Sequence, residues 1–243
     1  KVGESVELPE WYYSQNIGGM ANLLEAMKAE GVNRLVFSSS AATYGMPDVD
    51  FVGEDFNCKP INPYGETKLI GEWLGRAAGK AWGLRAVNLR YFNVAGAGWD
   101  DLADTAVANL IPIAFAALKA GETPKVFGDD YATADGSCVR DYVHVLDLAD
   151  AHLAALKYLE RDDRTFDTFN VGTGTGSSVF EVLAEIKNAT GIDFEPEPGL
   201  ADNGDLEHDL QALFEQVGLA AKAAHTALAI FIDELQYVEE PQL

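Results

Sequence analysis

A tyrosine and a lysine stand four positions apart in the segment INPYGETK, as Tyr64 and Lys68. A helical pattern begins at this segment, and residues at positions i and i+4 lie on one face of a helix. An ammonium beside a phenol stabilises the phenolate, so we expect the pKa of Tyr64 to lie below its usual value of about 10. A phenolate near neutral pH is a general base for an alcohol. If a hydride leaves the same carbon, the reaction is a dehydrogenation, which needs a hydride acceptor such as a nicotinamide.

A group of hydroxyl side chains lies upstream of this pair. The apolar segment RLVF predicts a short buried strand over residues 34–40, which ends in Ser38, Ser39 and Ser40. Ligands of open α/β sheets bind at the carboxyl ends of the strands, so a serine there is placed to share a substrate hydroxyl with Tyr64. Serines at a strand end also form turns, and Tyr-x-x-x-Lys occurs by chance in many chains. Neither pattern therefore identifies a site by itself.

Strands and helices alternate along most of the chain. Helical spacing predicts helices over 9–30, 63–82 and 105–121, and a further helix that ends at Gly191. Strands are predicted at 34–40, at the start of 84–98, in PKVFG and in TFDTFNV. Residues 140–160 are predicted to be a strand that leads into a helix capped by Asp147. This alternation predicts an α/β fold of βαβ units with a mostly parallel sheet.

Charge and cysteine content restrict the partners. The 243-residue chain has a net charge of −22, which argues against nucleic acid or an acidic membrane surface as a partner. No stretch reaches the 18 to 20 apolar residues, approximately, that a membrane-spanning helix needs. Cys58 and Cys138 lie far apart without metal-ligand spacing, so we predict a reduced, cytoplasmic protein and no metal site.

Five segments carry a resemblance in their order and spacing: SSSAATYG, NPYGETK, LRYFNVAGA, FGDDY followed by VRDYVHVLDLADAHLAAL, and FNVGTGTGSSV. Over residues 1 to about 191 the chain resembles the UDP-glucose 4-epimerase family of the extended short-chain dehydrogenase/reductase superfamily. The resemblance implies a Rossmann-like parallel sheet that binds NAD(P), with a small substrate-binding region. It also implies a homodimer, because the helices at 9–30 and 63–82 are similar to those that pair the family's subunits.

The resemblance further implies a set of roles. Tyr64 is similar to the catalytic base, Lys68 to the partner that lowers its pKa, and Ser40 to the assisting hydroxyl. The implied contacts with NAD come from Asn16, Ser38, Ser39, Tyr64, Lys68 and Phe92. The implied contacts with the UDP-sugar come from Ser40, Asn93, Asn109, Leu110, Val126, Phe127 and Arg140. The implied reaction, a step of galactose metabolism, interconverts UDP-glucose and UDP-galactose through a 4-keto sugar, with NAD taking and returning the hydride.

Both ends of the chain depart from the family pattern. The family carries its glycine-rich dinucleotide loop some 80 residues before the segment that here follows Lys1, so we expect an N-terminally truncated chain that lacks the first βαβ units. Residues 192–243 hold twelve acidic residues and one lysine. Within them, ALAIFIDELQ resembles the Walker B strand of a bacterial AAA-type ATPase, but the sequence contains no G-x-x-x-x-G-K-[ST] to cradle phosphates. We therefore expect two domains, an incomplete epimerase-like domain over 1–191 and a foreign acidic segment over 192–243.

Two alternatives to UDP-glucose 4-epimerisation stay open. The substrate is then another UDP-sugar, such as UDP-N-acetylglucosamine or a UDP-pentose, or the chain is a non-catalytic fragment that acts by oligomerisation. Dehydration is disfavoured, because related dehydratases carry an acidic pair after the strand-end hydroxyl, where this chain has Ala41 and Ala42.

Overall fold

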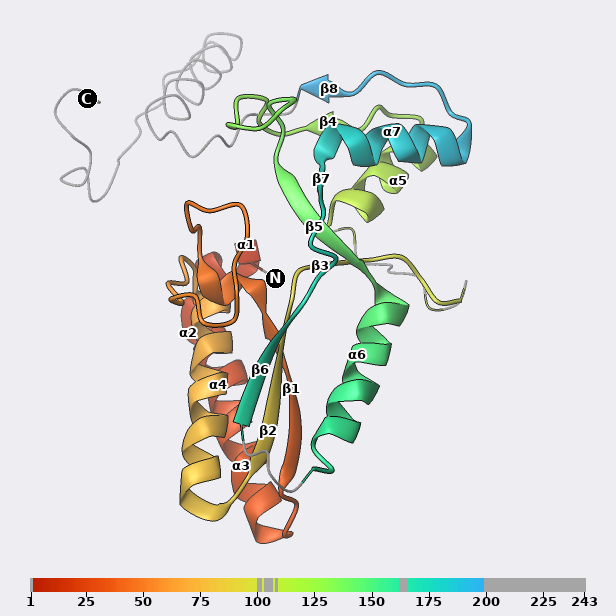
Figure 1. The fold of residues 1–243 in the computed structure, drawn as a ribbon. Helices are drawn as coiled ribbons and strands as arrows, with labels where there is room; N and C mark the ends of the chain where they lie inside the picture. Colours follow the sequence, from red (N-terminus) through yellow and green to blue (C-terminus); the bar gives the residue numbers. More distant parts are fainter. Residues whose placement is uncertain (1, 100–101, 103–106, 108, 162–165, 199–243) are drawn as a thin grey trace, which may run out of the picture. The chain divides into compact units, whose positions relative to one another are not determined.

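The computed structural model describes residues 2–99, 102, 107, 109–161 and 166–198 (Figure 1). The chain divides into two compact units. The first comprises residues 1–116 and 140–177, and the second comprises 117–139 and 178–243. Among the described helices none is long and apolar enough to cross a membrane.

A parallel sheet of three strands forms the centre of the first unit. Its order is β1 (Arg34–Ser40), β2 (Arg85–Tyr91) and β6 (Phe166–Val171). The register places Ser40 of β1 opposite Tyr91 of β2, and Tyr91 opposite Val171 of β6. The carboxyl ends of the three strands therefore meet at one end of the sheet. The predicted Rossmann-like α/β fold and the predicted strand over 34–40 are confirmed.

One face of this sheet is covered by the helices that precede and follow β1 (Figure 1). Helices α3 (Gly19–Ala29) and α4 (Pro63–Trp82) pack on the sheet, and α1 (Val2–Glu7) and α2 (Pro9–Tyr12) pack against α4. The prediction of one helix over 9–30 is corrected in its middle, where Tyr13–Gly18 form a π-helical segment, η1, between α2 and α3. The buried side chains between helices and sheet are Met20, Leu24, Met27, Ala78, Leu84 and Ala86.

The opposite face is covered by α6 (Val145–Tyr158) (Figure 1). Successive residues of a strand point to opposite faces, so Ala86 faces α3 and α4 while Val87 packs with Ala155 of α6. The prediction that Asp147 caps α6 is wrong. The cap is His144, whose Nδ1 accepts the N–H of Leu146 at 3.2 Å, and Asp147 lies within the first turn. The ring nitrogen of His144 therefore takes the place of the side-chain oxygen that usually accepts this hydrogen bond at the start of a helix.

Shorter elements connect these layers. A 3₁₀ turn, η2 (Ala41–Tyr44), follows β1 directly, and β3 (Asn93–Ala95) follows β2. Strand β3 pairs in parallel with β5 (Val139–His144), which neighbours β7 (Gly176–Ser178). Helix α5 spans Leu110–Ala120, within the predicted 105–121, and most of residues 105–108 lie outside the described residues.

The second unit contains α7 (Val179–Thr190) and a short parallel pair, β4 (Lys125–Val126) with β8 (Glu197–Pro198). A capping box between Ser178 and Glu181 begins α7, and Gly191 ends it with φ of 68°, as predicted. Strand β8 lies beyond the expected domain boundary at 191, which stays a prediction. The segment that resembles an ATPase strand lies outside the described residues.

Candidate active site

The first two turns of α4 carry the tyrosine and the lysine. Asn62 caps the helix by accepting the N–H of Gly65 at 2.9 Å, and Pro63 occupies the first turn. The side chains of Tyr64 and Lys68 follow on one face, with Lys68 Nζ 5.5 Å from the centroid of the Tyr64 ring. The placement predicted from their spacing is confirmed.

Close packing of α4 against η2 brings Tyr64 to the end of β1. A Cβ on Gly65 would lie 2.6 Å from the carbonyl oxygen of Ala42, so a glycine is needed for this approach. Ser40, the last residue of β1, caps η2 by accepting the N–H of Ala42 at 3.1 Å. The Ser40 hydroxyl also lies near the phenol of Tyr64, where it acts to lower the pKa of that phenol. The structure therefore joins the predicted base to the predicted assisting hydroxyl.

Lys68 is anchored to the strand. Its Nζ donates to the carbonyl oxygen of Ser38 at 2.9 Å. The hydroxyl of Ser38 lies 3.1 Å from His152 Nε2, on α6. The other ring nitrogen, Nδ1, lies 2.8 Å from the carbonyl oxygen of Leu148, which can only accept, so a neutral ring carries its proton on Nδ1 and Nε2 accepts from Ser38. Helices on both faces of the sheet thus meet at Ser38.

His152 was missed by sequence reasoning. The segment HVLDLADAH shows a histidine one or two turns into a helix, and the sequence offered no signal for its contact with a serine more than a hundred positions away. Only the parallel sheet, which places α6 beside β1, brings them together.

Burial governs the protonation of the pair. Removal from water raises the pKa of Tyr64, because it disfavours the charged phenolate, while the Ser40 hydroxyl lowers it and Tyr91 raises it. Burial also lowers the pKa of Lys68. The expectation that the pKa of Tyr64 lies below 10 is therefore wrong for this state. The ammonium is directed to the Ser38 carbonyl rather than to the phenol oxygen, and the loss of water outweighs its attraction.

The three strand-end serines divide between the two faces of the sheet. Ser38 points toward α6, as its contact with His152 shows. Ser39 is 0% exposed and donates to Glu72 Oε1 of α4 at 2.5 Å. The structure therefore brings Ser38 and Ser40 to the site, whereas the hydroxyl of Ser39 is enclosed in the protein interior.

Two further predicted contacts of NAD lie near this centre. Asn16, in η1, donates through Nδ2 to Thr67 Oγ1 at 2.9 Å, and Thr67 in turn donates to the carbonyl oxygen of Tyr64. Phe92 follows β2 directly, and its N–H donates to the carbonyl oxygen of Val171 at 3.1 Å. Both positions are fixed by the elements that hold Tyr64 and the strand ends.

The predicted UDP-sugar contacts are distributed over the two units. In the first unit, Asn93 begins β3, Asn109 directly precedes α5, Leu110 begins α5, and Arg140 lies exposed in β5. In the second unit, Val126 is buried in β4, and Phe127 beside it is 53% exposed.

Comparisons with known proteins agree with this arrangement. Residues 1–172 match the NAD dependent epimerase/dehydratase family. A UDP-glucose 4-epimerase of Lactobacillus helveticus is 47% identical over 211 residues, covering 84% of this chain and 63% of that protein. One of Rhizobium meliloti is 48% identical over 191 residues, covering 77% of this chain and 58% of that protein.

Solved structures give the same result. The crystal structure of UDP-glucose 4-epimerase from Brucella ovis in complex with NAD matches with a TM-score of 0.75 and 38% identity, covering 94% of this chain and 70% of that one. Another UDP-glucose 4-epimerase structure matches with a TM-score of 0.79 and 41% identity, covering 84% and 63%. The chain spans about three fifths of the length of the curated relatives, 63% and 58% for the two above. With a family match over most of its length and the tyrosine, lysine and serine at one end of a parallel sheet, the chain belongs to the NAD dependent epimerase/dehydratase family.

Proposed function

We propose that this chain carries the reaction centre of a UDP-glucose 4-epimerase, an isomerase that interconverts UDP-glucose and UDP-galactose with bound NAD. One observation supports this most strongly: the close approach of α4 to η2 places Tyr64 beside Ser40 at the carboxyl end of β1, one helical turn from the anchored Lys68. A base beside a second hydroxyl at this end of a parallel sheet suits the deprotonation of an alcohol.

The donors at the site fit NAD. Among the described residues, the Lys68 ammonium makes one hydrogen bond, to Ser38, which leaves two N–H groups for the hydroxyls of a ribose. Asn16 and Phe92 lie on the elements that flank these groups. Similar structures from Brucella ovis and Thermus thermophilus were solved with NAD, which supports the same cofactor here.

The chain's residues handle the proton of the reaction. Tyr64 takes the proton from the 4-hydroxyl of the sugar, and the Ser40 hydroxyl hydrogen-bonds the same oxygen and holds it in place. Bound NAD would supply the hydride acceptor for C4 and the source of the hydride that returns to the opposite face of the sugar. Tyr64 then returns its proton to the new hydroxyl. Arg140 offers a guanidinium for the diphosphate in an otherwise acidic chain.

Other UDP-sugars have support from three comparisons. The UDP-Glc/GlcNAc 4-epimerase of Campylobacter jejuni is 42% identical and matches with a TM-score of 0.71, and a UDP-N-acetylglucosamine 4-epimerase of Methanobrevibacter ruminantium is 29% identical with the same TM-score. An epimerase of Stenotrophomonas maltophila, 41% identical with a TM-score of 0.77, was solved with formylated UDP-arabinopyranose. UDP-N-acetylglucosamine and a UDP-pentose are therefore the alternatives to UDP-glucose in the same reaction.

We also infer a homodimer in the cytoplasm that binds neither nucleic acid nor membranes. Helices α3 and α4 form an open apolar groove on their outer side, which suits the packing of two further helices. Its lining residues are Ala21, Leu24, Glu25, Lys28, Leu74, Ala77, Ala78, Ala81 and Trp82. Cys58 and Cys138 are free thiols, which supports a reducing compartment, and the net charge of −22 repels polyanions.

Binding of NAD to the purified full chain tests the cofactor assignment. We expect isothermal titration to show binding to the chain and a loss of at least about 10-fold in affinity in Lys68→Met, since charged hydrogen bonds contribute about 1.5–3 kcal/mol. Lys80→Met is the matched control, because Lys80 lies exposed in the last turn of the same helix.

Equal affinities for the chain and Lys68→Met would mean that NAD, if it binds, does not contact this face of α4. An absence of binding at millimolar NAD would refute the proposed cofactor for this chain.

A further inference from the structure

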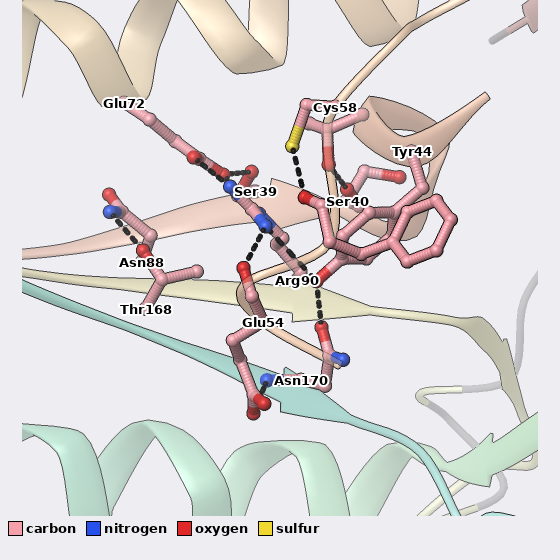
Figure 2. Close-up of polar contacts among 12 residues, drawn as sticks. Ser39, Ser40, Tyr44, Glu54, Cys58, Glu72, Asn88, Arg90, Thr168 and Asn170 are labelled. Atoms are coloured by element: carbon pink, nitrogen blue, oxygen red, sulfur yellow. Dashed lines mark hydrogen bonds and ion pairs between the residues drawn. The ribbon is translucent and has the colours of Figure 1, made fainter. Parts of the chain in front are cut away.

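A buried ion pair joins Glu72 to Arg90, beside Ser39 at the end of β1 (Figure 2). Arg90 of β2 donates from Nη2 to Glu72 Oε2 at 2.6 Å and from Nε to Glu72 Oε1 at 2.9 Å. Glu72 is 0% exposed and Arg90 is 5% exposed. Desolvation of two charges offsets most of their attraction, so stability alone does not account for such a pair.

Glu72 continues the line of site residues along α4. Tyr64, Lys68 and Glu72 follow at intervals of four and share one helix face. Glu72 Oε1 also accepts the hydroxyl hydrogen bond of Ser39, the residue before Ser40. The carboxylate therefore fixes the rotation of α4 against the end of β1.

Arg90 holds the residues on the other side of Ser40. Its Nη1 donates to the hydroxyl of Tyr44 at 3.0 Å, and its guanidinium lies 4.9 Å from the centroid of the Tyr44 ring. Tyr44 in turn donates to Asn170 Oδ1 of β6 at 2.7 Å, and the carbonyl oxygen of Glu54 accepts from Arg90 at 3.3 Å. Figure 2 shows these contacts converging on the guanidinium. Tyr44 ends η2, the turn that Ser40 caps.

We infer that Glu72 and Arg90 are positioning residues that hold Ser40 beside Tyr64. Glu72 fixes Ser39, the residue before Ser40, and Arg90 fixes Tyr44, the last residue of the turn that Ser40 caps. The inference rests on the proposed function for the roles of Ser40 and Tyr64, and it concerns their geometry before any ligand binds. Bidentate pairing between a planar guanidinium and a carboxylate suits this task, because it fixes orientation as well as distance.

The test replaces the pair by apolar side chains in the double variant Glu72→Leu/Arg90→Met. Apolar replacement of a buried ion pair is often neutral for stability, so the fold and the position of Ser40 can be separated. The matched control is Asn88→Leu/Thr168→Val. Asn88 lies two residues from Arg90 on β2 and donates to Thr168 Oγ1 at 3.0 Å, away from Ser40.

The readout is the pKa of Tyr64 in the ligand-free full chain, followed by NMR of tyrosine labelled with ¹³C at Cζ and assigned with Tyr64→Phe. The Ser40 hydroxyl lowers this pKa, so displacement of Ser40 from Tyr64 raises the pKa. Lys68, Tyr91 and Tyr12 are titratable groups near Tyr64, and they are the same in every variant.

We expect the upward shift in Glu72→Leu/Arg90→Met and its absence in the control. An unchanged pKa in the double variant, or an equal shift in the control, would overturn the inference. If the double variant does not fold, Ser39→Ala decides, because it cuts the link from Glu72 to the neighbour of Ser40 and leaves the ion pair intact. It is expected to raise the pKa of Tyr64 too, and no shift there would overturn the inference.

These results are independent of catalysis. A shift in a chain that neither binds NAD nor turns over a UDP-sugar would refute the proposed function and leave the positioning role standing. An active chain whose Glu72→Leu/Arg90→Met variant keeps both the pKa and the full rate would refute the positioning role alone.

Discussion

At the scale of single residues, the state of the Tyr64 phenol depends on a balance between burial and one hydroxyl. Burial raises its pKa, and the hydroxyl of Ser40 opposes that rise. Lys68 Nζ, held at the Ser38 carbonyl, stands 5.5 Å from the ring centroid. The ligand-free site thus keeps the phenol protonated near neutral pH, and Ser40 is the residue that brings the base closer to its working state.

Replacement of Ser40 by alanine is expected to move the pH dependence of epimerisation. The base accepts a proton only as a phenolate, so the rate falls as the pH drops below the pKa of Tyr64. Loss of the Ser40 hydroxyl raises that pKa, so the pH below which log kcat/KM falls moves to a higher value.

Initial rates are compared from about pH 7 to about pH 11.5, because burial raises the pKa of Tyr64 above its ordinary value and the range must extend beyond it. Ser14→Ala is the control, because Ser14 is exposed and lies in η1. A Ser40→Ala profile that is lower but keeps its position on the pH axis would contradict the role of Ser40 in setting the pKa.

Part of the residue-level site could be predicted from the sequence. The one-turn spacing of Tyr64 and Lys68 fixes their shared face, whatever surrounds the helix. The burial of the Ser39 hydroxyl could not be predicted, because it depends on which face of β1 packs against Glu72. The raised pKa of Tyr64 was not predicted either, since burial depends on the whole fold rather than on the three residues between the pair.

At the scale of elements, the site depends on how closely α4 approaches η2. The structure confirms the bounds of α4 as predicted, because Asn62, Pro63 and Gly83 mark its ends in the sequence. Its packing against Ala42 was not predictable, because helical periodicity does not show which backbone a glycine faces.

Replacement of Gly65 by alanine is expected to destabilise the protein by about 1–3 kcal/mol, since its Cβ would lie 2.6 Å from the carbonyl oxygen of Ala42. Gly75→Ala on the same helix is the matched control. Its Cβ would meet Phe166 and Ala86 at 3.7 and 3.8 Å, ordinary contacts, so it is expected to be neutral or to stabilise by up to about 1 kcal/mol.

Urea denaturation of the two variants and the unchanged chain measures both effects. Equal stability of Gly65→Ala and Gly75→Ala would show that α4 does not press on η2 in solution.

The region before α3 shows where element prediction failed. Apolar spacing over 9–30 indicates one continuous helix, but Tyr13–Gly18 are π-helical. Such a segment needs only one extra residue per turn, which apolar periodicity barely registers. Asn16 lies in this segment, where it bonds Thr67 between Tyr64 and Lys68.

At the scale of the whole molecule, we expect two copies of the chain to pair through the outer surface of α3 and α4. Ala77 is exposed and lines the apolar groove between these helices. If two copies pair there, Ala77→Glu places two desolvated like charges in the interface and shifts the protein toward the monomer.

Light scattering after size-exclusion chromatography measures the mass. Ala154→Glu on the exposed side of α6 is the control and should leave the dimer intact. A chain of monomeric mass, or an Ala77→Glu variant that stays dimeric, would contradict this assembly.

The architecture was predictable to the level of a parallel sheet with helices on both faces, because alternating strands and helices permit few other arrangements. The short pair of β4 with β8 was not predictable, since each strand has two residues and joins segments about 70 positions apart. The assignment of residues 192–243 to a separate segment rests on composition and on the resemblance of ALAIFIDELQ to a Walker B strand, and it stays a prediction.

Conversion of UDP-galactose to UDP-glucose by the full chain with NAD tests the central claim most directly. The proposed site predicts turnover by the unchanged chain and by the control variant Tyr158→Phe. The hydroxyl that this control removes lies on α6, where it donates to Asp167. The site also predicts a loss of at least about 100-fold in Tyr64→Phe, because that variant has no general base at the strand end. Turnover by Tyr64→Phe at the rate of the unchanged chain, or a chain that binds NAD and both sugars without interconverting them, would contradict the account.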